Sequence, residues 1–192
     1  MKTITITAAD MQSRVSRFRA LEPLSATTSL DMPQAAKDVI YSRTLLSVIG
    51  LDGNDDTPIN QGAPIKGAGG ITMTHAVCPP GTGPSLHAHR RTFETFTVLR
   101  GRFEVFWNDD GGARVVLDEF DTLSVPPGVC RGFRNIGDAD GILQVIISGG
   151  VHDMQDIDFP QTTAAQLAAY GANVVEQFKA RGMTFTAGAD AD

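Results

Sequence analysis

The sequence has few cysteines, no long hydrophobic run and no concentrated basic segment. Its two cysteines, Cys78 and Cys130, are too few to define a disulfide framework. The opening residues, MKTITITAADMQSR, lack an apolar stretch of signal-peptide length, and no later segment approaches the length of a membrane span. We therefore expect a cytoplasmic protein that does not associate with a membrane and whose thiols are both reduced.

Acidic residues outnumber basic ones, which gives a formal net charge of −6. A nucleic-acid-binding protein needs a clustered basic face. The nearest approach to one is Arg14, Arg17 and Arg19 on a single short segment, a pattern typical of the solvated face of a helix. The composition therefore argues against a nucleic-acid partner.

Changes in residue pattern divide the chain into three parts. Apolar residues recur at helical spacing near both ends, whereas the middle consists of short β-type runs separated by turn residues. We predict a helical arm over residues 1–38, a β-barrel over residues 39–158 and a helical extension over residues 159–192. There is no internal repeat, so we expect one barrel and not two.

The arm should contain two helices. The first extends over Thr7–Leu21 with Asp10 in its first turn, and the second begins at Asp31 or Met32 with Pro33 in its first turn. The arm must pack on the barrel or on a partner subunit. Because such appendages often cover barrel edges or exchange between subunits, we expect a homodimer.

The extension should also be helical. Thr162 or Thr163 can cap a helix that Gly171 interrupts and Gly182 ends. The small, acidic tail Ala187–Asp192 is expected to be disordered.

Eight β-type runs make up the predicted barrel. They are rich in β-branched and aromatic residues, and turn residues that tolerate positive φ separate them. The segment Asn108–Gly112 predicts a hairpin. Eight closely spaced strands indicate an all-β sandwich or barrel of the jelly-roll kind. The runs are Ile40–Val48, Gly70–Cys78, Thr95–Leu99, Arg102–Trp107, Ala113–Leu117, Thr122–Val125, Val129–Arg134 and Ile142–Ser148.

The segment GTGPSLHAHRRTFE, residues 81–94, carries the candidate chemistry. Residues two apart on a strand share a face, so His87 and His89 point to the same side. Glu94 begins the next strand and closes a third corner. Two imidazoles and a carboxylate on one face suit a divalent first-row metal ion such as Fe, Mn, Ni, Co or Zn. The alternative is a pair of exposed loop histidines beside a surface glutamate.

This segment resembles the first motif of the cupin superfamily, G-x5-H-x-H-x4-E-x6-G, at every position. The matching residues are Gly81, His87, His89, Glu94 and Gly101. The resemblance covers roughly residues 40–150. It implies a double-stranded β-helix with the site inside the barrel. The short helical extensions predicted at both ends are additions to such a barrel.

The second cupin motif, G-x5-P-x-G-x2-H-x3-N, is matched only in part. Pro126, Gly128 and Asn135 fall where the resemblance places them. Phe120 stands in the first glycine position, and Arg131 stands where the fourth metal ligand, a histidine, is expected. A guanidinium has no lone pair to offer, so Arg131 cannot replace that ligand.

Three arrangements of Arg131 are open. In the first, Arg131 swings away, leaves an open three-ligand site and anchors a substrate anion. In the second, Arg131 pairs with Glu94, so that the pocket holds no metal. In the third, another residue completes the ligand set. For the third arrangement, Cys130 should face away from Arg131 and is better explained as a small buried thiol. His75 is better explained as a hydrogen-bonded core or rim residue, and His152 as a surface or subunit-contact residue.

Apolar residues should surround the site. Phe96 and Val98 share the strand face of Glu94, and Phe133 shares that of Arg131. They would line a small-molecule pocket, form the barrel core, or do both. Phe103, Val105 and Trp107 lie on one face of their strand and Phe106 on the other, and the pattern does not say which face is inward.

Two functions follow from these residues. The first is a metal-dependent enzyme acting on a small organic substrate, since three protein ligands leave coordination positions free. The resemblance implies dioxygenases, isomerases and metal-bound binding proteins as the range, and a dioxygenase is our first choice. Glu94 would be a ligand or an acid/base, and Arg131 would orient an anionic substrate. The second is a non-catalytic small-molecule-binding protein in which a Glu94–Arg131 pair replaces the ion.

Overall fold

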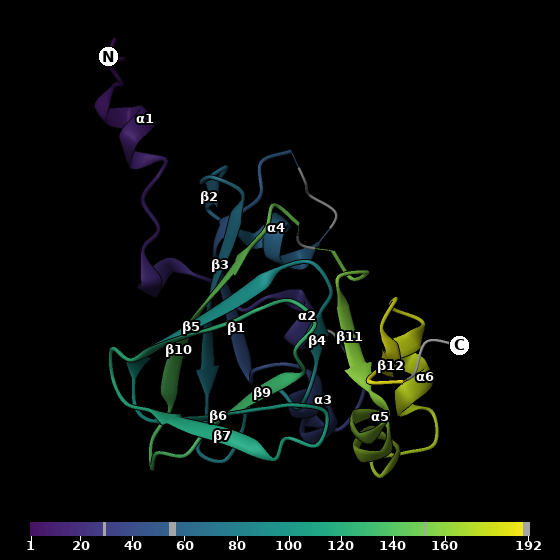
Figure 1. Cartoon of the computed structure of the whole chain (residues 1–192). Coiled ribbons are helices and arrows are strands. Elements are labelled where there is room, and N and C mark those ends of the chain that lie inside the picture. Colours follow the sequence, from purple (N-terminus) through teal and green to yellow (C-terminus); the bar gives the residue numbers. More distant parts are fainter. Residues whose placement is uncertain (29, 54–56, 152, 190–192) are drawn as a thin grey trace.

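Strands dominate the structure, and helices lie mainly toward the two ends of the chain (Figure 1). This computed structural model describes residues 1–28, 30–53, 57–151 and 153–189. The elements are α1 (Ala8–Gln12), η1 (Phe18–Ala20), α2 (Ser25–Thr28), α3 (Gln34–Ile40), β1 (Thr44–Gly50), α4 (Pro58–Gly62), β2 (Ile65–Lys66), β3 (Ile71–Cys78), β4 (Ala88–His89), β5 (Phe93–Arg100), β6 (Phe103–Trp107), β7 (Ala113–Leu117), β8 (Thr122–Val125), β9 (Arg131–Asn135), β10 (Gly141–Ser148), β11 (Ile157–Pro160), α5 (Gln161–Ala168), α6 (Val174–Lys179) and β12 (Thr184–Ala187).

The strands form a barrel of two facing layers. One layer is a six-stranded sheet in the order β2-β1-β3-β10-β5-β8, and the other contains β7-β6-β9. A third sheet, β12-β11-β4, continues this second layer, because His87 forms a β-bridge with Arg131 of β9. Neighbouring strands are far apart in sequence, as in β3-β10-β5. The predicted double-stranded β-helix is therefore confirmed.

The core lies between the two layers. Inward and outward side chains alternate along β5 and β10, as a half-buried strand requires. Phe103 and Val105 are fully buried in this core, which settles the facing of β6 that the sequence left open. Each such side chain contributes about 1.5–3 kcal/mol by leaving water. The remaining buried members are Ala76, Cys78, Phe96, Val98, Leu117, Val125, Phe133, Leu143, Val145 and Ile147.

Two turns have the backbone conformations that the sequence pattern predicts. The predicted hairpin is confirmed: β6 pairs antiparallel with β7 and Trp107 lies opposite Ala113, while Asn108 turns with a φ of 69°. Phe120 has a φ of 73° and its side chain is 76% exposed. A left-handed backbone favours glycine, so the position that the second cupin motif gives to glycine keeps its turn here with a bulky residue.

The N-terminal arm is less helical than predicted. The helix expected over Thr7–Leu21 is wrong in length: α1 covers Ala8–Gln12, with Thr7 as N-cap, and only the 3-10 turn η1 follows. None of the α1 residues is buried, and a helix without a packing partner is marginal in water. The segment that carries α1 projects away from the barrel at the top left of Figure 1, whereas α3 packs against the rest of the chain.

The second predicted helix also begins elsewhere. Pro33 is the N-cap of α3 and does not lie in its first turn, so the predicted caps Asp31 and Met32 lie outside the helix. The helix continues to Ile40, and the strand expected from that residue therefore starts at Thr44. The longer helix keeps Ala36 and Ile40 buried against helices near the other end of the chain.

The C-terminal region contains two strands that the sequence did not predict, β11 and β12. We refer to residues 153–189 as the C-terminal extension. Pro160 caps α5, so the predicted caps Thr162 and Thr163 lie inside the helix, where the Thr163 hydroxyl donates to the Leu86 carbonyl at 2.9 Å. Ala187 belongs to β12 and is ordered; residues 190–192 of the predicted disordered tail lie outside the described residues. The extension packs with α3 into a second apolar core.

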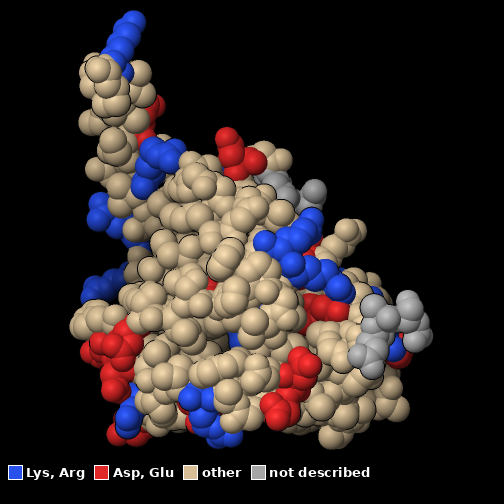
Figure 2. Space-filling model, in the orientation of Figure 1, with Lys and Arg blue, Asp and Glu red and all other residues tan. Residues whose placement is uncertain are grey.

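The sequence predicted neither a membrane span nor a nucleic-acid partner, and the helices and the surface relate to these two predictions. Among the described residues, no helix has the length and apolar character to cross a membrane. On the face drawn in Figure 2, Lys and Arg side chains occur in small groups near Asp and Glu and form no continuous basic area. The absence of a nucleic-acid partner stays a prediction.

Candidate metal centre

Backbone pairing brings the three predicted ligands together inside the barrel. His87 and Arg131 exchange two backbone hydrogen bonds, of 2.9 and 2.8 Å, which place the His-x-His strand against β9. Glu94 enters from β5 in the opposite layer. His87, His89 and Glu94 are all buried, so the alternative of exposed loop histidines is wrong.

The three donor atoms converge on one point. The Glu94 Oε2 atom lies 3.4 Å from His87 Nε2 and 3.9 Å from His89 Nε2. The three ligand atoms all lie within 4.8 Å of one another. Atoms that each bind an ion at about 2.1 Å are about 3–4 Å apart when they share one face of it. Both Glu94–histidine distances lie in this range, so the donor set is close to the spacing that a divalent first-row metal ion requires.

The outer hydrogen bonds of both imidazoles leave the Nε2 lone pairs facing Glu94. His87 Nδ1 lies 3.0 Å from the Ser85 carbonyl oxygen, which only accepts, so this nitrogen carries the proton. His89 Nδ1 lies 3.2 Å from Asp156 Oδ2 and 2.9 Å from Thr92 Oγ1. In neutral rings, two nitrogen lone pairs and a carboxylate oxygen then face one another, and a cation is what such a set of acceptors binds.

The environment of Glu94 and His89 favours the protonation states in which they bind metal. Burial alone would raise the pKa of Glu94, but the Arg131 charge and the neighbouring histidines hold that pKa well below its ordinary value. Burial lowers the pKa of His89, against the pull of Glu94. A carboxylate beside a neutral imidazole is the combination that a metal ion requires.

The Arg131 side chain makes the Glu94 contact of the second arrangement considered. It is fully buried, and its Nε–H donates to Glu94 Oε2 at 2.8 Å. Its Nη1–H donates to the Val129 carbonyl at 3.1 Å, whereas the buried Nη2 has no hydrogen-bond partner among the described residues. The side chain does not swing away, but its Nη2 group has no hydrogen-bond partner among the described residues.

No fourth protein ligand joins the cluster in the described part of the chain. Cys130, directly before β9, is buried against Leu86 and Ala88, as predicted for a small thiol. His75 lies on the outer face of β3 beside the Phe18 ring, and its Nδ1 has no hydrogen-bond partner in the described part of the chain, unlike the predicted hydrogen-bonded residue. His152 lies outside the described residues.

The predicted pocket residues lie in the barrel core. Phe96, on the Glu94 face of β5, packs edge to face against Phe133 at 5.2 Å between ring centroids. Val98 is fully buried one pleat further along the same strand. A role in lining a substrate pocket stays a prediction for all three.

Sequence reasoning missed three residues around the histidines. Thr92 and Asp156 contact His89, and the Phe159 ring lies 6.0 Å from that of His87. Thr92 lies within the first motif at a position where the motif allows any residue. Asp156 and Phe159 belong to the C-terminal extension, and no spacing pattern connects them with residues 87–94.

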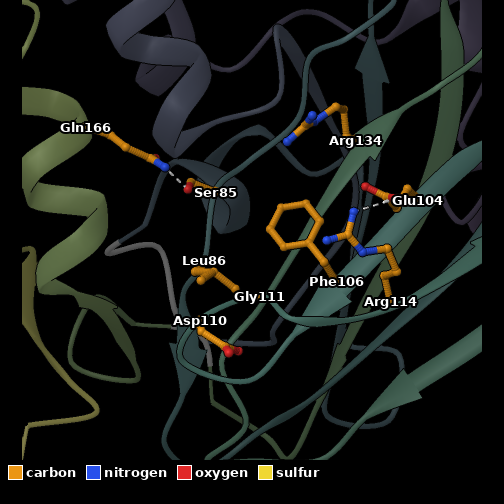
Figure 3. A pocket seen from close by; sticks show the side chains of 9 residues that line it. All are labelled: Ser85, Leu86, Glu104, Phe106, Asp110, Gly111, Arg114, Arg134 and Gln166. Atoms are coloured by element: carbon orange, nitrogen blue, oxygen red, sulfur yellow. Dashed lines mark hydrogen bonds and ion pairs between the residues drawn. The ribbon is translucent and has the colours of Figure 1, made fainter.

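A surface hollow of about 210 Å³ lies outside the barrel (Figure 3). Phe106 faces it from the outer side of β6, with the Arg134 guanidinium 5.9 Å from its ring centroid. An Arg114–Glu104 ion pair of 3.5 Å crosses one wall. None of the three clustered ligands lines this hollow, so it is separate from the candidate metal centre.

The paired β-layers enclosing a His-His-Glu cluster define a double-stranded β-helix of the kind that holds metal sites. Residues 74–147 match the cupin domain family. The chain therefore carries a cupin domain over these residues. Among curated proteins, none matches the chain.

Several solved structures share part of this fold. An uncharacterized conserved protein with a double-stranded β-helix domain from Klebsiella pneumoniae is 24% identical over 42% of this chain and 68% of its own, with a TM-score of 0.39. A predicted oxalate decarboxylase from Thermotoga maritima is 25% identical over 40% of this chain and 64% of its own (TM-score 0.37). A Cupin 2 conserved barrel domain protein from Salinispora arenicola is 20% identical over 58% and 71% (TM-score 0.37). The present chain thus spans roughly two thirds of the length of these proteins.

Proposed function

We propose that this protein is a metal-dependent enzyme that acts on a small organic substrate bearing an anionic group. The observation that carries the proposal is the convergence of His87 Nε2, His89 Nε2 and Glu94 Oε2 inside the barrel. Both Nδ1 atoms have acceptors of their own, so neither Nε2 needs its lone pair for a structural hydrogen bond.

Each residue of the site has a separate role in this proposal. His87, His89 and Glu94 would hold a divalent first-row metal ion. Arg131, whose buried Nη2 has no partner among the described residues, would bind a substrate carboxylate or similar anion. An ion with three protein ligands supplies Lewis acidity, or reactivity toward O₂, at its open positions. Within the enzymes, a dioxygenase is our first candidate for that reason, and an acid/base role of Glu94 remains part of the proposal.

The Glu94–Arg131 contact favours a second candidate, a small-molecule-binding protein without metal. The guanidinium already neutralises the carboxylate at 2.8 Å. At about 5 Å, its repulsion of a dication would reach several kcal/mol at an effective dielectric constant of ~20. The carboxylate would then serve only as the partner of the buried arginine.

Metal titration separates the two candidates. The metal-free protein is incubated in turn with Fe²⁺, Mn²⁺, Co²⁺, Ni²⁺ and Zn²⁺, desalted and analysed for metal and protein. We expect about one equivalent of at least one ion per chain, because the described residues contain one cluster of three buried ligands. Negligible metal after all five incubations would contradict the enzyme proposal and favour the binding protein.

We also propose a homodimer that forms through the N-terminal arm. Ile4 is 90% exposed and Met11 51% exposed on a segment that projects from the barrel. Burying such side chains against a second copy would stabilise the dimer. Sedimentation should give twice the chain mass of 20.4 kDa, and Ile4→Ser/Ile6→Ser should shift the protein toward monomer. The matched control, Thr3→Ser/Thr5→Ser, should not. A monomeric wild type would contradict the proposal.

A cytoplasmic location completes the proposal. Cys78 and Cys130 are both unpaired and buried. Burial raises the pKa of each thiol to about 11. Both therefore stay protonated near neutral pH, which fits a reducing compartment.

A further inference from the structure

We propose that Asp156 is a positioning residue: it fixes the tautomer in which His89 presents its Nε2 lone pair to the metal centre. Its consequence for metal binding rests on the proposed function, but the tautomer itself is a property of the metal-free protein. Position 156 lies beyond residues 74–147, which match the cupin domain. This chain's C-terminal extension would therefore complete a site whose ligands all come from the cupin domain.

Strand pairing places Asp156 beside the His89 imidazole. In β11, Ile157 lies opposite His89 of β4. The Arg90 backbone N–H donates to the Asp156 carbonyl at 2.7 Å, and the Asp156 N–H donates to Asp153 Oδ1 at 2.9 Å. The main chain of Asp156 is thus anchored at both its N–H and its carbonyl, and its carboxylate is buried.

The two carboxylate oxygens of Asp156 have different partners. Oδ1 accepts from the Arg91 backbone N–H at 2.8 Å. Oδ2 accepts from the Thr92 hydroxyl at 2.6 Å and lies 3.2 Å from His89 Nδ1. Since the single Thr92 hydroxyl proton goes to Oδ2, its oxygen faces His89 Nδ1 as an acceptor at 2.9 Å. His89 Nδ1 therefore faces two acceptors and must carry the proton.

This proton placement decides whether His89 can be a ligand. A neutral imidazole has one protonated and one unprotonated nitrogen, and only the latter binds a metal ion. With the proton on Nδ1, the lone pair is on Nε2, the atom that faces Glu94 Oε2 at 3.9 Å. With the proton on Nε2, the ring would turn an N–H toward the centre and bind no metal there.

Asp156→Asn tests the proposal with almost no change in shape. The Arg91 N–H can only donate, so it holds the asparagine carbonyl and turns the NH₂ group toward Thr92 and His89. His89 Nδ1 then faces a donor, and the proton should move to Nε2. Long-range ¹H–¹⁵N NMR spectra of metal-free protein should show the Nδ1–H form of His89 in the wild type and the Nε2–H form in D156N. Affinity for Zn²⁺ or Co²⁺ should fall about 10- to 100-fold.

Asp158→Asn is the matched control. Asp158 is a buried carboxylate two residues further along, and it accepts from Arg90, Thr184 and Thr186 but does not contact His89. D158N should loosen the extension and leave the His89 tautomer unchanged. If D158N moved the proton as D156N does, packing of the extension and not Asp156 would set the tautomer, and the proposal would be overturned.

The wild type alone provides a second test if D156N does not fold. A proton on His89 Nε2 in metal-free wild-type protein would overturn the proposal directly. Failure of the proposed function gives a different result. In that case the tautomer would still change between wild type and D156N, while neither protein bound metal.

Discussion

His87→Ala is expected to abolish metal binding, lowering the metal content from about one equivalent per chain to background. The substitution removes one of three donors and leaves only His89 and Glu94, too few to compete with water for a divalent ion. In the wild type, a metal ion at about 100 times its dissociation constant should add about 2.7 kcal/mol to the free energy of unfolding. H87A should gain none of it, and thermal unfolding with and without metal measures the difference.

His75→Ala is the matched control for this experiment. His75 lies on the outer face of β3, where its ring centroid is 5.6 Å from that of Phe18. It should keep the full metal content and the full stabilisation by metal. Equal stabilisation of H87A and the wild type by metal would show that the ion binds elsewhere, and the proposed centre would be abandoned.

Arg131→Met should destabilise the metal-free protein by about 3–5 kcal/mol, because it leaves the buried Glu94 carboxylate without its partner. Metal should restore much of this loss, since a dication bound to Glu94 and the histidines neutralises the same carboxylate. Denaturant unfolding of metal-free and metal-loaded R131M measures both effects.

Two further variants show whether the pair accounts for the loss. Glu94→Gln/Arg131→Met removes both charges and should lose less stability than the two single variants combined, with no recovery on adding metal. Arg134→Met, on the same strand, removes an exposed guanidinium that lies over the Phe106 ring, and should change stability by about 1 kcal/mol or less. If metal stabilised neither R131M nor the wild type, the second candidate function would be the better account of the site.

The sequence predicted the parts of the fold that follow from local pattern. Strands β3, β5 and β10 alternate in burial because one face of each meets the core, and alternation is visible in the residues themselves. The helix predicted over Thr7–Leu21 is wrong in length because the apolar residues of α1 have no buried surface to pack against. Strand β11 was missed because it contains Asp158, a buried charge whose side-chain partners are all distant in sequence.

The same distinction applies to the site. His87, His89 and Glu94 are close in sequence, and their spacing on strands predicted their convergence. The motif placed Arg131 near them but could not give the direction of its side chain, which depends on contacts with Glu94 and Val129. Asp156 is 67 residues from His89, and only the pairing of β11 with β4 brings them together.

The placement of β4 between β9 and β11 has a consequence for how the molecule is made. Residues 87–94 leave the ribosome well before residues 153–160, so the histidines are synthesised while the strand that flanks them is still missing. During that interval His89 has no Asp156 and His87 has no Phe159 beside it. A nascent chain would accordingly hold an ion loosely, and tight loading would wait until the last flanking strand has been translated.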